Sequence, residues 1–162
     1  MPLPSSIGLI KACYKHPLYM EHLIVSKVRS IARYRWAERH PEKDGCVPPP
    51  LGYKLVLTYK CNLRCIMCYE WGEVGWCHDQ PRETMAKELD WAIISKLFAE
   101  VGHTRPYFIL IGGEPLLYSR FNELARLVRD HRCFAIVCTN GLLLGNYVQT
   151  IAENPYLTFL IS

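Results

Sequence analysis

The sequence predicts an α/β protein whose strands form one parallel sheet, with a helical extension in front of it. Two observations lead to this prediction. Short apolar runs alternate with stretches in which apolar residues recur every three or four positions, which is typical of successive β/α units. The apolar runs also lack the polar alternation of half-exposed strands, which favours strands buried on both faces of a parallel sheet.

Residues 1–50 are predicted to be a helical N-terminal extension followed by a Pro-rich linker. After Pro17, apolar residues recur at helical spacing, at Met20, Ile24, Val28 and Ile31. The run Pro48–Pro50 cannot continue a helix and indicates an extended connection. A helix that packs on its own domain is the interpretation we favour, and a membrane-surface helix or a partner-binding arm is the alternative.

The net charge of +4 is unevenly distributed along the chain. Between Lys11 and Lys43, eight Lys and Arg residues stand against three acidic residues, which gives +5 and leaves the remainder at −1. A weakly basic extension is compatible with an anionic partner without requiring one. We predict no nucleic-acid partner.

The sequence also bears on compartment and on cysteine chemistry. No run approaches the roughly 18 apolar residues of a membrane span, and Ile7–Ile10 is too short for the apolar core of a signal peptide. Three of the eight cysteines lie within eight residues of one another. We therefore predict a cytoplasmic protein whose clustered cysteines bind metal and do not form a disulfide framework.

From residue 51 onward the pattern predicts four strands, each of the first three followed by a helix. The predicted strands are Lys54–Tyr59, Tyr107–Ile111, Cys133–Cys138 and Tyr156–Ile161. Short connections between such elements are typical of parallel β/α units.

Three helices are predicted between the strands. The first is Arg82–Val101, with an apolar stripe at Met85, Leu89, Ile93 and Leu97. The second begins after Ser119, which can cap it, and presents Phe121, Leu124 and Val128 on one face. The third is the short segment Leu143–Glu153.

The densest candidate for chemistry follows the first predicted strand, where Cys61, Cys65 and Cys68 are spaced by three and two residues. Thiolates suit iron–sulfur clusters, zinc and copper(I). Three cysteines on a cluster of four irons leave one iron without a protein ligand, and such an iron can bind a substrate. The alternative is a zinc-binding structural or interaction module with a closed site of four ligands, in which Cys77 or His78 supplies the fourth and Cys77 is the favoured one.

The segment from Cys61 to Cys68, CNLRCIMC, resembles the signature loop of the radical S-adenosylmethionine (radical SAM) superfamily. The resemblance implies that the three cysteines bind three irons of a [4Fe–4S] cluster. The methionyl amino and carboxylate groups of S-adenosylmethionine would chelate the fourth iron. Met67 stands where the family commonly has an aromatic residue, and it is expected beside the adenine.

The later strand ends also resemble the family. Gly112-Gly113-Glu114-Pro115 after the second strand matches its glycine–glycine–glutamate–proline motif, in which residues without a Cβ let the backbone approach the cosubstrate. The resemblance implies that Glu114 places a carboxylate near the cosubstrate's ammonium group. It also implies that Thr139 directs a hydroxyl to the cosubstrate, and that Ser162 contacts it from the end of the fourth strand.

The resemblance implies a partial (β/α)6 barrel of TIM-like architecture, of which residues 51–162 are the core domain truncated after the fourth strand. It implies reductive cleavage of S-adenosylmethionine to a 5′-deoxyadenosyl radical, which abstracts hydrogen from an unknown substrate. An electron donor such as flavodoxin or ferredoxin is the expected partner. Since a full parallel barrel takes roughly 250 residues, we interpret the chain as an N-terminal fragment and expect it to be inactive alone.

Overall fold

The computed structural model describes residues 17–43 and 50–162, and the chain divides into two units, Met1–Leu51 and Gly52–Ser162. In the first unit, helix α2 (Pro17–Arg39) is followed by a 3-10 turn, Pro41–Lys43, so the helix predicted after Pro17 is confirmed. The predicted linker at 44–49 lies outside the described residues. No helix in the described ranges is both long and apolar enough to cross a membrane.

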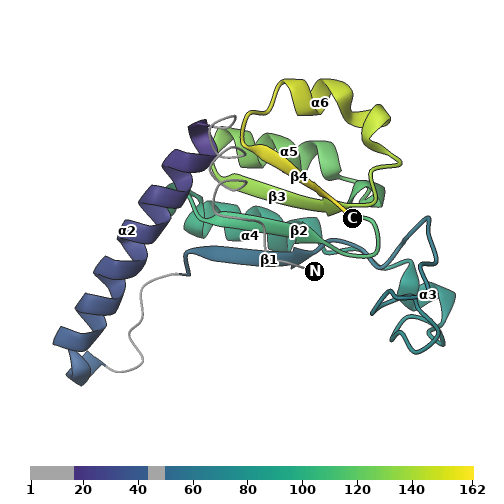
Figure 1. Ribbon diagram of the computed structural model, residues 1–162, viewed down its shortest axis with the longest axis horizontal. Coiled ribbons are helices and arrows are strands. Elements are labelled where there is room, and N and C mark those ends of the chain that lie inside the picture. Colours follow the sequence, from purple (N-terminus) through teal and green to yellow (C-terminus); the bar gives the residue numbers. More distant parts are fainter. Residues whose placement is uncertain (1–16, 44–49) are drawn as a thin grey trace. The chain divides into compact units, whose positions relative to one another are not determined.

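The second unit is built on one sheet of four parallel strands. They are β1 (Gly52–Val56), β2 (Tyr107–Ile111), β3 (Phe134–Thr139) and β4 (Leu157–Ile161). Their order in the sheet is their order in the chain, and every neighbouring pair is parallel (Figure 1). The predicted α/β class and the four parallel strands are therefore confirmed.

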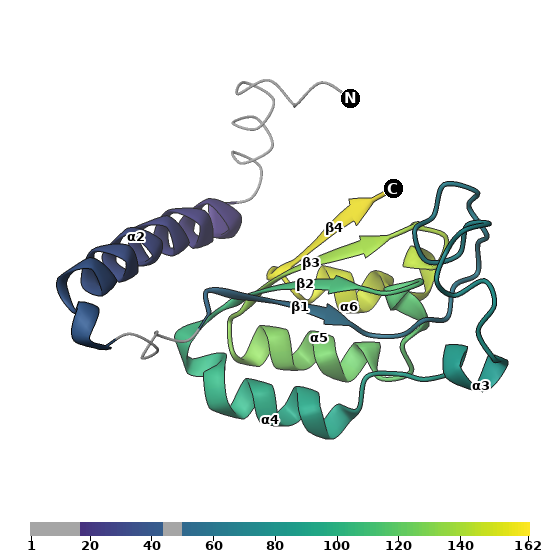
Figure 2. The same cartoon turned by 90° about the horizontal axis from the view of Figure 1, so that it is seen from below.

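Three helices of this unit cover one face of the sheet, α4 (Trp91–Val101), α5 (Phe121–Asp130) and α6 (Val148–Ala152). The short helix α3 (Arg82–Met85) lies beyond the carboxyl ends of the strands, beside the segment that follows β1 (Figure 2). Figure 2 shows α4 and α5 side by side beneath the strands. The core lies between them and the sheet, where Phe98 of α4 stacks on Phe108 of β2 at a ring distance of 4.6 Å.

The expectation of strands buried on both faces is wrong for the described residues. In β2, Phe108 and Leu110 are fully buried beneath the helices, whereas Ile109 and Ile111 on the opposite face are only half-buried. Lys54 lies on that more open face, because its register partner is Ile109. It is the only charged residue in the four described strands. The apolar run of β2 thus contains a two-residue alternation in burial.

The single helix predicted for Arg82–Val101 is also wrong. The segment between α3 and α4 is extended instead: Glu88 forms an antiparallel bridge with Thr58, and the Leu89 N–H donates to the Leu57 carbonyl at 2.8 Å. Asp90 then caps α4 by accepting from the Ala92 N–H at 2.8 Å. Pairing with the segment directly after β1 outweighs the continuous helical pattern.

Two further details of the helices differ from expectation. The buried face of α4 is Ile94 and Phe98, while Ile93 of the predicted stripe is 58% exposed. Ser119 does not cap α5, whose N-cap position is Arg120, because the Ser119 hydroxyl donates to Glu88 instead. The predicted buried face of α5 is confirmed. The last predicted helix begins as a 3-10 turn, Leu144–Tyr147, and continues as α6.

Candidate functional site

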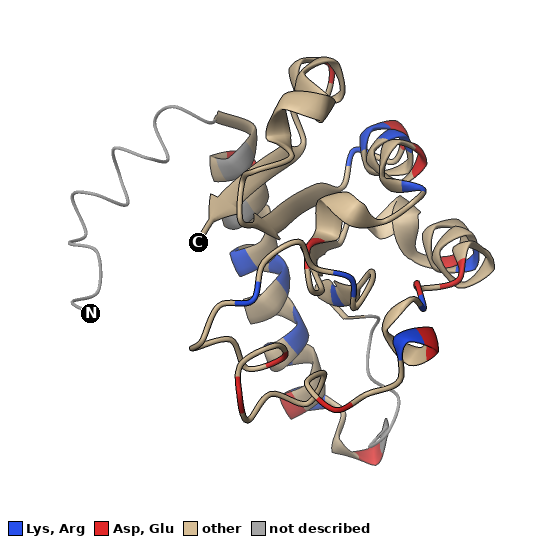
Figure 3. Ribbon diagram, turned by 90° about the vertical axis from the view of Figure 1, so that its right-hand side faces the viewer, with Lys and Arg blue, Asp and Glu red and all other residues tan. Residues whose placement is uncertain are grey.

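The residues that the sequence singles out follow the carboxyl ends of all four strands. The cysteine loop comes after β1, Gly112 to Glu114 follow β2, Thr139 ends β3, and Ser162 follows β4, where its N–H donates to the Thr139 carbonyl at 3.1 Å. Parallel strands present their carboxyl ends on one side of a sheet. Figure 3 looks onto this edge, where basic and acidic residues are interspersed along the connecting segments.

Gly113 and Glu114 bind the start of the cysteine loop through their backbone N–H groups. The Gly113 N–H donates to the Thr58 carbonyl at 2.8 Å, and the Glu114 N–H donates to the Lys60 carbonyl at 2.7 Å. A Cβ on Gly112 would lie 2.3 Å from the Thr58 oxygen, and one on Gly113 would lie 2.4 Å from the Lys60 oxygen. The close approach that requires glycine is therefore to the chain's own loop.

Glu114 is buried, with 1% of its surface exposed, and its carboxylate accepts hydrogen bonds from three groups. Oε1 accepts from the Leu116 N–H at 3.0 Å and from the Thr139 hydroxyl at 2.7 Å. Oε2 accepts from the Asn140 N–H at 2.9 Å. The Glu114 carboxylate thus ties the end of β3 to the turn after β2, and the Thr139 hydroxyl belongs to the same buried network.

Replacing Glu114 with glutamine should destabilise this edge. All three partners of the carboxylate donate to it. In a glutamine, the side-chain NH₂ group would replace one of the two oxygens and would face at least one of these donors. A buried polar group left without a partner costs about 1–3 kcal/mol. Urea unfolding should show a loss in that range, whereas Glu100→Gln, at an exposed ion pair with Lys96 on α4, should change little. Equal unfolding free energies for the two variants would contradict this assignment.

The cysteine loop runs through a series of turns, and its three thiols differ in environment. Cys61 and Cys68 are half-buried, and Cys65 is exposed. The Leu63 N–H donates to Cys61 Sγ at 3.4 Å, and the Trp71 N–H donates to Cys68 Sγ at 3.3 Å. Within the described part of the chain, no three His, Cys, Asp or Glu side chains are gathered around a single metal ion position.

The surroundings of Cys61 combine partial burial with open space. Burial raises the pKa of the Cys61 thiol, the Leu63 N–H counteracts this, and the nearby Glu114 carboxylate adds to it. A hollow of about 650 Å³ opens beside Cys61, between the loop and α3, with Arg64 on its wall. Cys77 also borders this hollow but is itself 1% exposed, and burial raises the pKa of its thiol. Met67 lies on the loop with 90% of its surface exposed.

The structure adds a contact that sequence reasoning missed. The Asn140 side-chain amide donates to the Asn62 side-chain carbonyl at 2.8 Å, although the two residues are 78 positions apart. Asn62 follows Cys61 directly, and Asn140 follows Thr139. This hydrogen bond joins the cysteine loop to the end of β3, and the only sequence signal was that each asparagine adjoins a motif residue.

Two more residues within the loop were missed. The guanidinium of Arg64 lies 3.7 Å from the centre of the Trp71 ring and donates to the Cys61 carbonyl at 2.8 Å, so it folds the loop back on itself. Gly72 has no room for a side chain, because a Cβ there would lie 2.6 Å from the Cys68 carbonyl oxygen. The only hint of this in the sequence was that a glycine stands four residues after Cys68, a candidate ligand.

Comparisons with known proteins place the chain in a family. A family model for the radical SAM superfamily matches residues 55–162. A probable GTP 3′,8-cyclase from Methanocella arvoryzae is 34% identical over 101 residues, which cover 62% of this chain and 30% of the relative. The GTP 3′,8-cyclase of Clostridium perfringens is 32% identical over 103 residues, with the same coverage. The chain thus spans less than a third of the length of these relatives.

Solved structures show the same fold. The crystal structure of Streptococcus suis SuiB bound to its precursor peptide SuiA superposes with a TM-score of 0.57 at 15% identity, over 82% of this chain and 28% of SuiB. SuiB bound to S-adenosylmethionine gives a TM-score of 0.56 at 15% identity, with the same coverage. At this identity the likeness concerns the fold.

Proposed function

Because the chain belongs to the radical SAM superfamily, we propose that Cys61, Cys65 and Cys68 bind a [4Fe–4S] cluster and that the neighbouring strand ends bind S-adenosylmethionine. The cluster and S-adenosylmethionine are the cofactors of this enzyme family. The observation that carries the proposal is the set of hydrogen bonds joining the cysteine loop to the ends of β2 and β3. The comparisons give no support to the zinc-binding module.

The loop suits a cluster in two respects. Backbone N–H groups point at Cys61 and Cys68, and such donors stabilise thiolate sulfur and tune a cluster's potential. The hollow beside Cys61 leaves room next to one of the thiols. Cys65, which is exposed, provides the third ligand from the same loop.

The cosubstrate site is proposed at the same edge. Gly112 and Gly113 bring main-chain groups beside the cysteine loop, and their carbonyls are candidates to accept from the cosubstrate's ammonium group. Glu114 and Thr139 act from behind this surface, since their polar groups bind one another and hold the edge together. Ser162 lies next to Thr139, and Met67 offers an exposed apolar side chain to the adenine.

When bound, the reduced cluster would supply one electron to the sulfonium of S-adenosylmethionine, whose C–S cleavage would give methionine and a 5′-deoxyadenosyl radical for hydrogen abstraction and leave the cluster oxidised by one electron. The chain's own residues bind and orient these groups. A one-electron reductant such as flavodoxin or ferredoxin is the partner that this reaction requires.

GTP is the first substrate to test, because the sequence relatives are named GTP 3′,8-cyclases. Lys54 is a candidate to contact the triphosphate. It is the sole charged side chain of the sheet, and it is exposed on the more open face. It lies two residues before the end of β1, near the carboxyl edge from which the cysteine loop extends. A peptide, as bound by SuiB, is the other candidate.

The test is anaerobic reconstitution of the full-length protein, followed by measurement of iron content and of 5′-deoxyadenosine with dithionite as reductant. We expect about four irons per chain and reductant-dependent 5′-deoxyadenosine, with formation stimulated by GTP. A colourless protein that binds one zinc and yields no 5′-deoxyadenosine would refute the proposal. A loaded protein that GTP does not stimulate would refute the substrate alone.

A further inference from the structure

Glu88 belongs to neither the cysteine motif nor the glycine–glycine–glutamate–proline motif. Hydrogen bonds hold its backbone beside the start of the cysteine loop. Glu88 and Thr58 form an isolated antiparallel β-bridge, and the N–H of the next residue, Leu89, donates to the Leu57 carbonyl at 2.8 Å. The backbone at Glu88 therefore lies beside the segment that connects β1 to Cys61. The side chain is 17% exposed, so it lies largely out of solvent.

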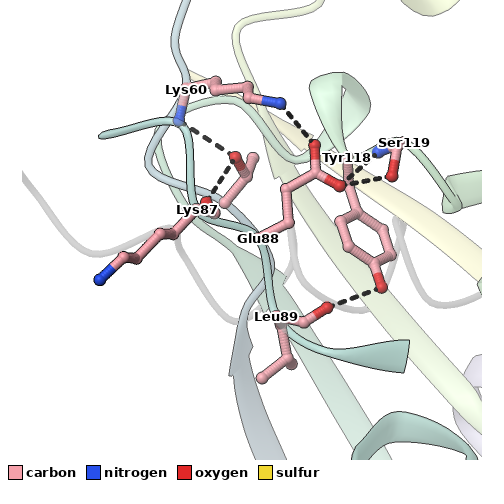
Figure 4. Close-up of polar contacts among 7 residues, drawn as sticks. Lys60, Lys87, Glu88, Leu89, Tyr118 and Ser119 are labelled. Atoms are coloured by element: carbon pink, nitrogen blue, oxygen red, sulfur yellow. Dashed lines mark hydrogen bonds and ion pairs between the residues drawn. The ribbon is translucent and has the colours of Figure 1, made fainter. Parts of the chain in front are cut away.

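The Glu88 carboxylate bridges two segments that both belong to the candidate site (Figure 4). Oε1 accepts from the Lys60 ammonium at 2.8 Å, and Lys60 directly precedes Cys61. Oε2 accepts from the Ser119 N–H at 3.2 Å and from the Ser119 hydroxyl. Ser119 ends the turn that follows the glycine–glycine–glutamate–proline motif, so one carboxylate connects the first cysteine to that turn.

A second contact strengthens the same connection. The Tyr118 hydroxyl donates to the Leu89 carbonyl at 2.9 Å, so two successive residues of each segment are bonded, Tyr118 to Leu89 and Ser119 to Glu88 (Figure 4). On its other side, the loop start is bound by Gly113 and Glu114 through the Thr58 and Lys60 carbonyls. The backbone of residues 58–60 is thus bound from both sides immediately before Cys61.

The electrostatics favour a charged carboxylate at this position. Burial acts to raise the pKa of the Glu88 carboxyl, but hydrogen bonds from Lys60 and Ser119 outweigh it and lower the pKa below its usual value. Hydrogen bonds that involve an ionised partner are shorter and stronger than neutral ones. A glutamine has the same shape but would turn its amide toward either Lys60 or Ser119, both of which are donors.

We propose that Glu88 is a positioning residue for the cluster, which sets the orientation of Cys61 relative to the glycine motif by holding Lys60 and Ser119 at fixed places. The inference rests on the proposed function, in which Cys61 is a cluster ligand. Glu88 itself touches neither the cluster nor the cosubstrate in this assignment. Its effect is transmitted through Lys60 and the backbone that precedes Cys61.

The test compares Glu88→Gln with a matched control in the full-length protein. Glu123→Gln is the control, because Glu123 also pairs with a basic side chain, Arg120 at 3.4 Å, but on the solvent-exposed side of α5. In the cluster-free protein, iodoacetamide labelling read by mass spectrometry should give a Cys61 to Cys65 rate ratio that rises at least threefold in Glu88→Gln only. This readout needs no bound cofactor.

In the reconstituted protein, Glu88→Gln should raise the KM for S-adenosylmethionine about tenfold, with a smaller change in kcat. It should also weaken the change that S-adenosylmethionine causes in the electron paramagnetic resonance spectrum of the reduced cluster. Lys60→Met should have the same effects, and the double variant should be no worse than either single one.

Unchanged labelling, KM and spectra in a Glu88→Gln variant that is merely less stable would overturn the inference, because the ion pair would then serve the fold alone. Additive effects in the double variant would overturn it as well. If wild-type protein fails to bind a cluster, the proposed function fails, yet the labelling ratio still decides whether Glu88 positions Cys61.

Discussion

Replacing any one of Cys61, Cys65 or Cys68 with alanine will abolish the visible absorbance of the reconstituted protein and its formation of 5′-deoxyadenosine. Each cysteine is assigned one iron of the cluster, and no other described cysteine lies on the loop within the motif's spacing. The measurements are the absorbance spectrum, iron content per chain and product formation after anaerobic reconstitution.

Cys133→Ala is the matched control for this experiment. Cys133 is buried in the core beside β3, and burial raises the pKa of its thiol to about 12, so it offers no thiolate at neutral pH. Its removal should leave the absorbance intact at a modest cost in stability. A variant lacking Cys65 that still forms the full cluster would sink the ligand assignment, since Cys65 is the exposed member of the three.

Gly113→Ala will reduce cluster loading to below about a tenth of wild type. The added Cβ would lie 2.4 Å from the Lys60 carbonyl oxygen and 2.6 Å from the Tyr59 carbonyl oxygen. Both are backbone atoms, so the loop start must move away and the hydrogen bond from Glu114 to Lys60 is lost. Overpacking of this kind typically costs about 1–3 kcal/mol, and here the displaced segment leads directly into Cys61.

Gly145→Ala provides the control, because a Cβ on Gly145 meets nothing within 4 Å. We expect that variant to load its cluster normally and to unfold at nearly the wild-type urea concentration. Normal loading in Gly113→Ala would show that the loop adapts to the added methyl group, and the close approach would then be unimportant for the site.

Local sequence patterns determined much of the fold. The strand predicted at Tyr107–Ile111 matches β2, and the buried face predicted for α5 is the observed one. Side chains on one face of a helix or strand recur at a fixed spacing along the sequence. The buried face can therefore be predicted from a short stretch of the chain. The order of cysteine loop, glycine motif and later strand ends likewise implied a common edge, because parallel strands end on the same side.

Patterns of this kind failed where a contact between distant segments competed with them. The stretch from Arg82 to Val101 has helical spacing throughout, yet Glu88 pairs with Thr58 and the helix breaks. Ser119 has the chemistry of a helix cap, but its hydroxyl has a charged acceptor in Glu88. In both cases the competing partner lies about thirty positions away, and no local window contains it.

The sequence by itself determined the class of chemistry, since thiolates at the spacing of Cys61, Cys65 and Cys68 carry their meaning within eight residues. Only the tertiary structure decided what holds those thiolates in place. Asn62 meets Asn140 across 78 positions, and Lys60 meets Glu88 across 28. Such pairs form when the sheet brings the segments together, because a hydrogen bond depends on distance in space and leaves no periodic trace along the chain.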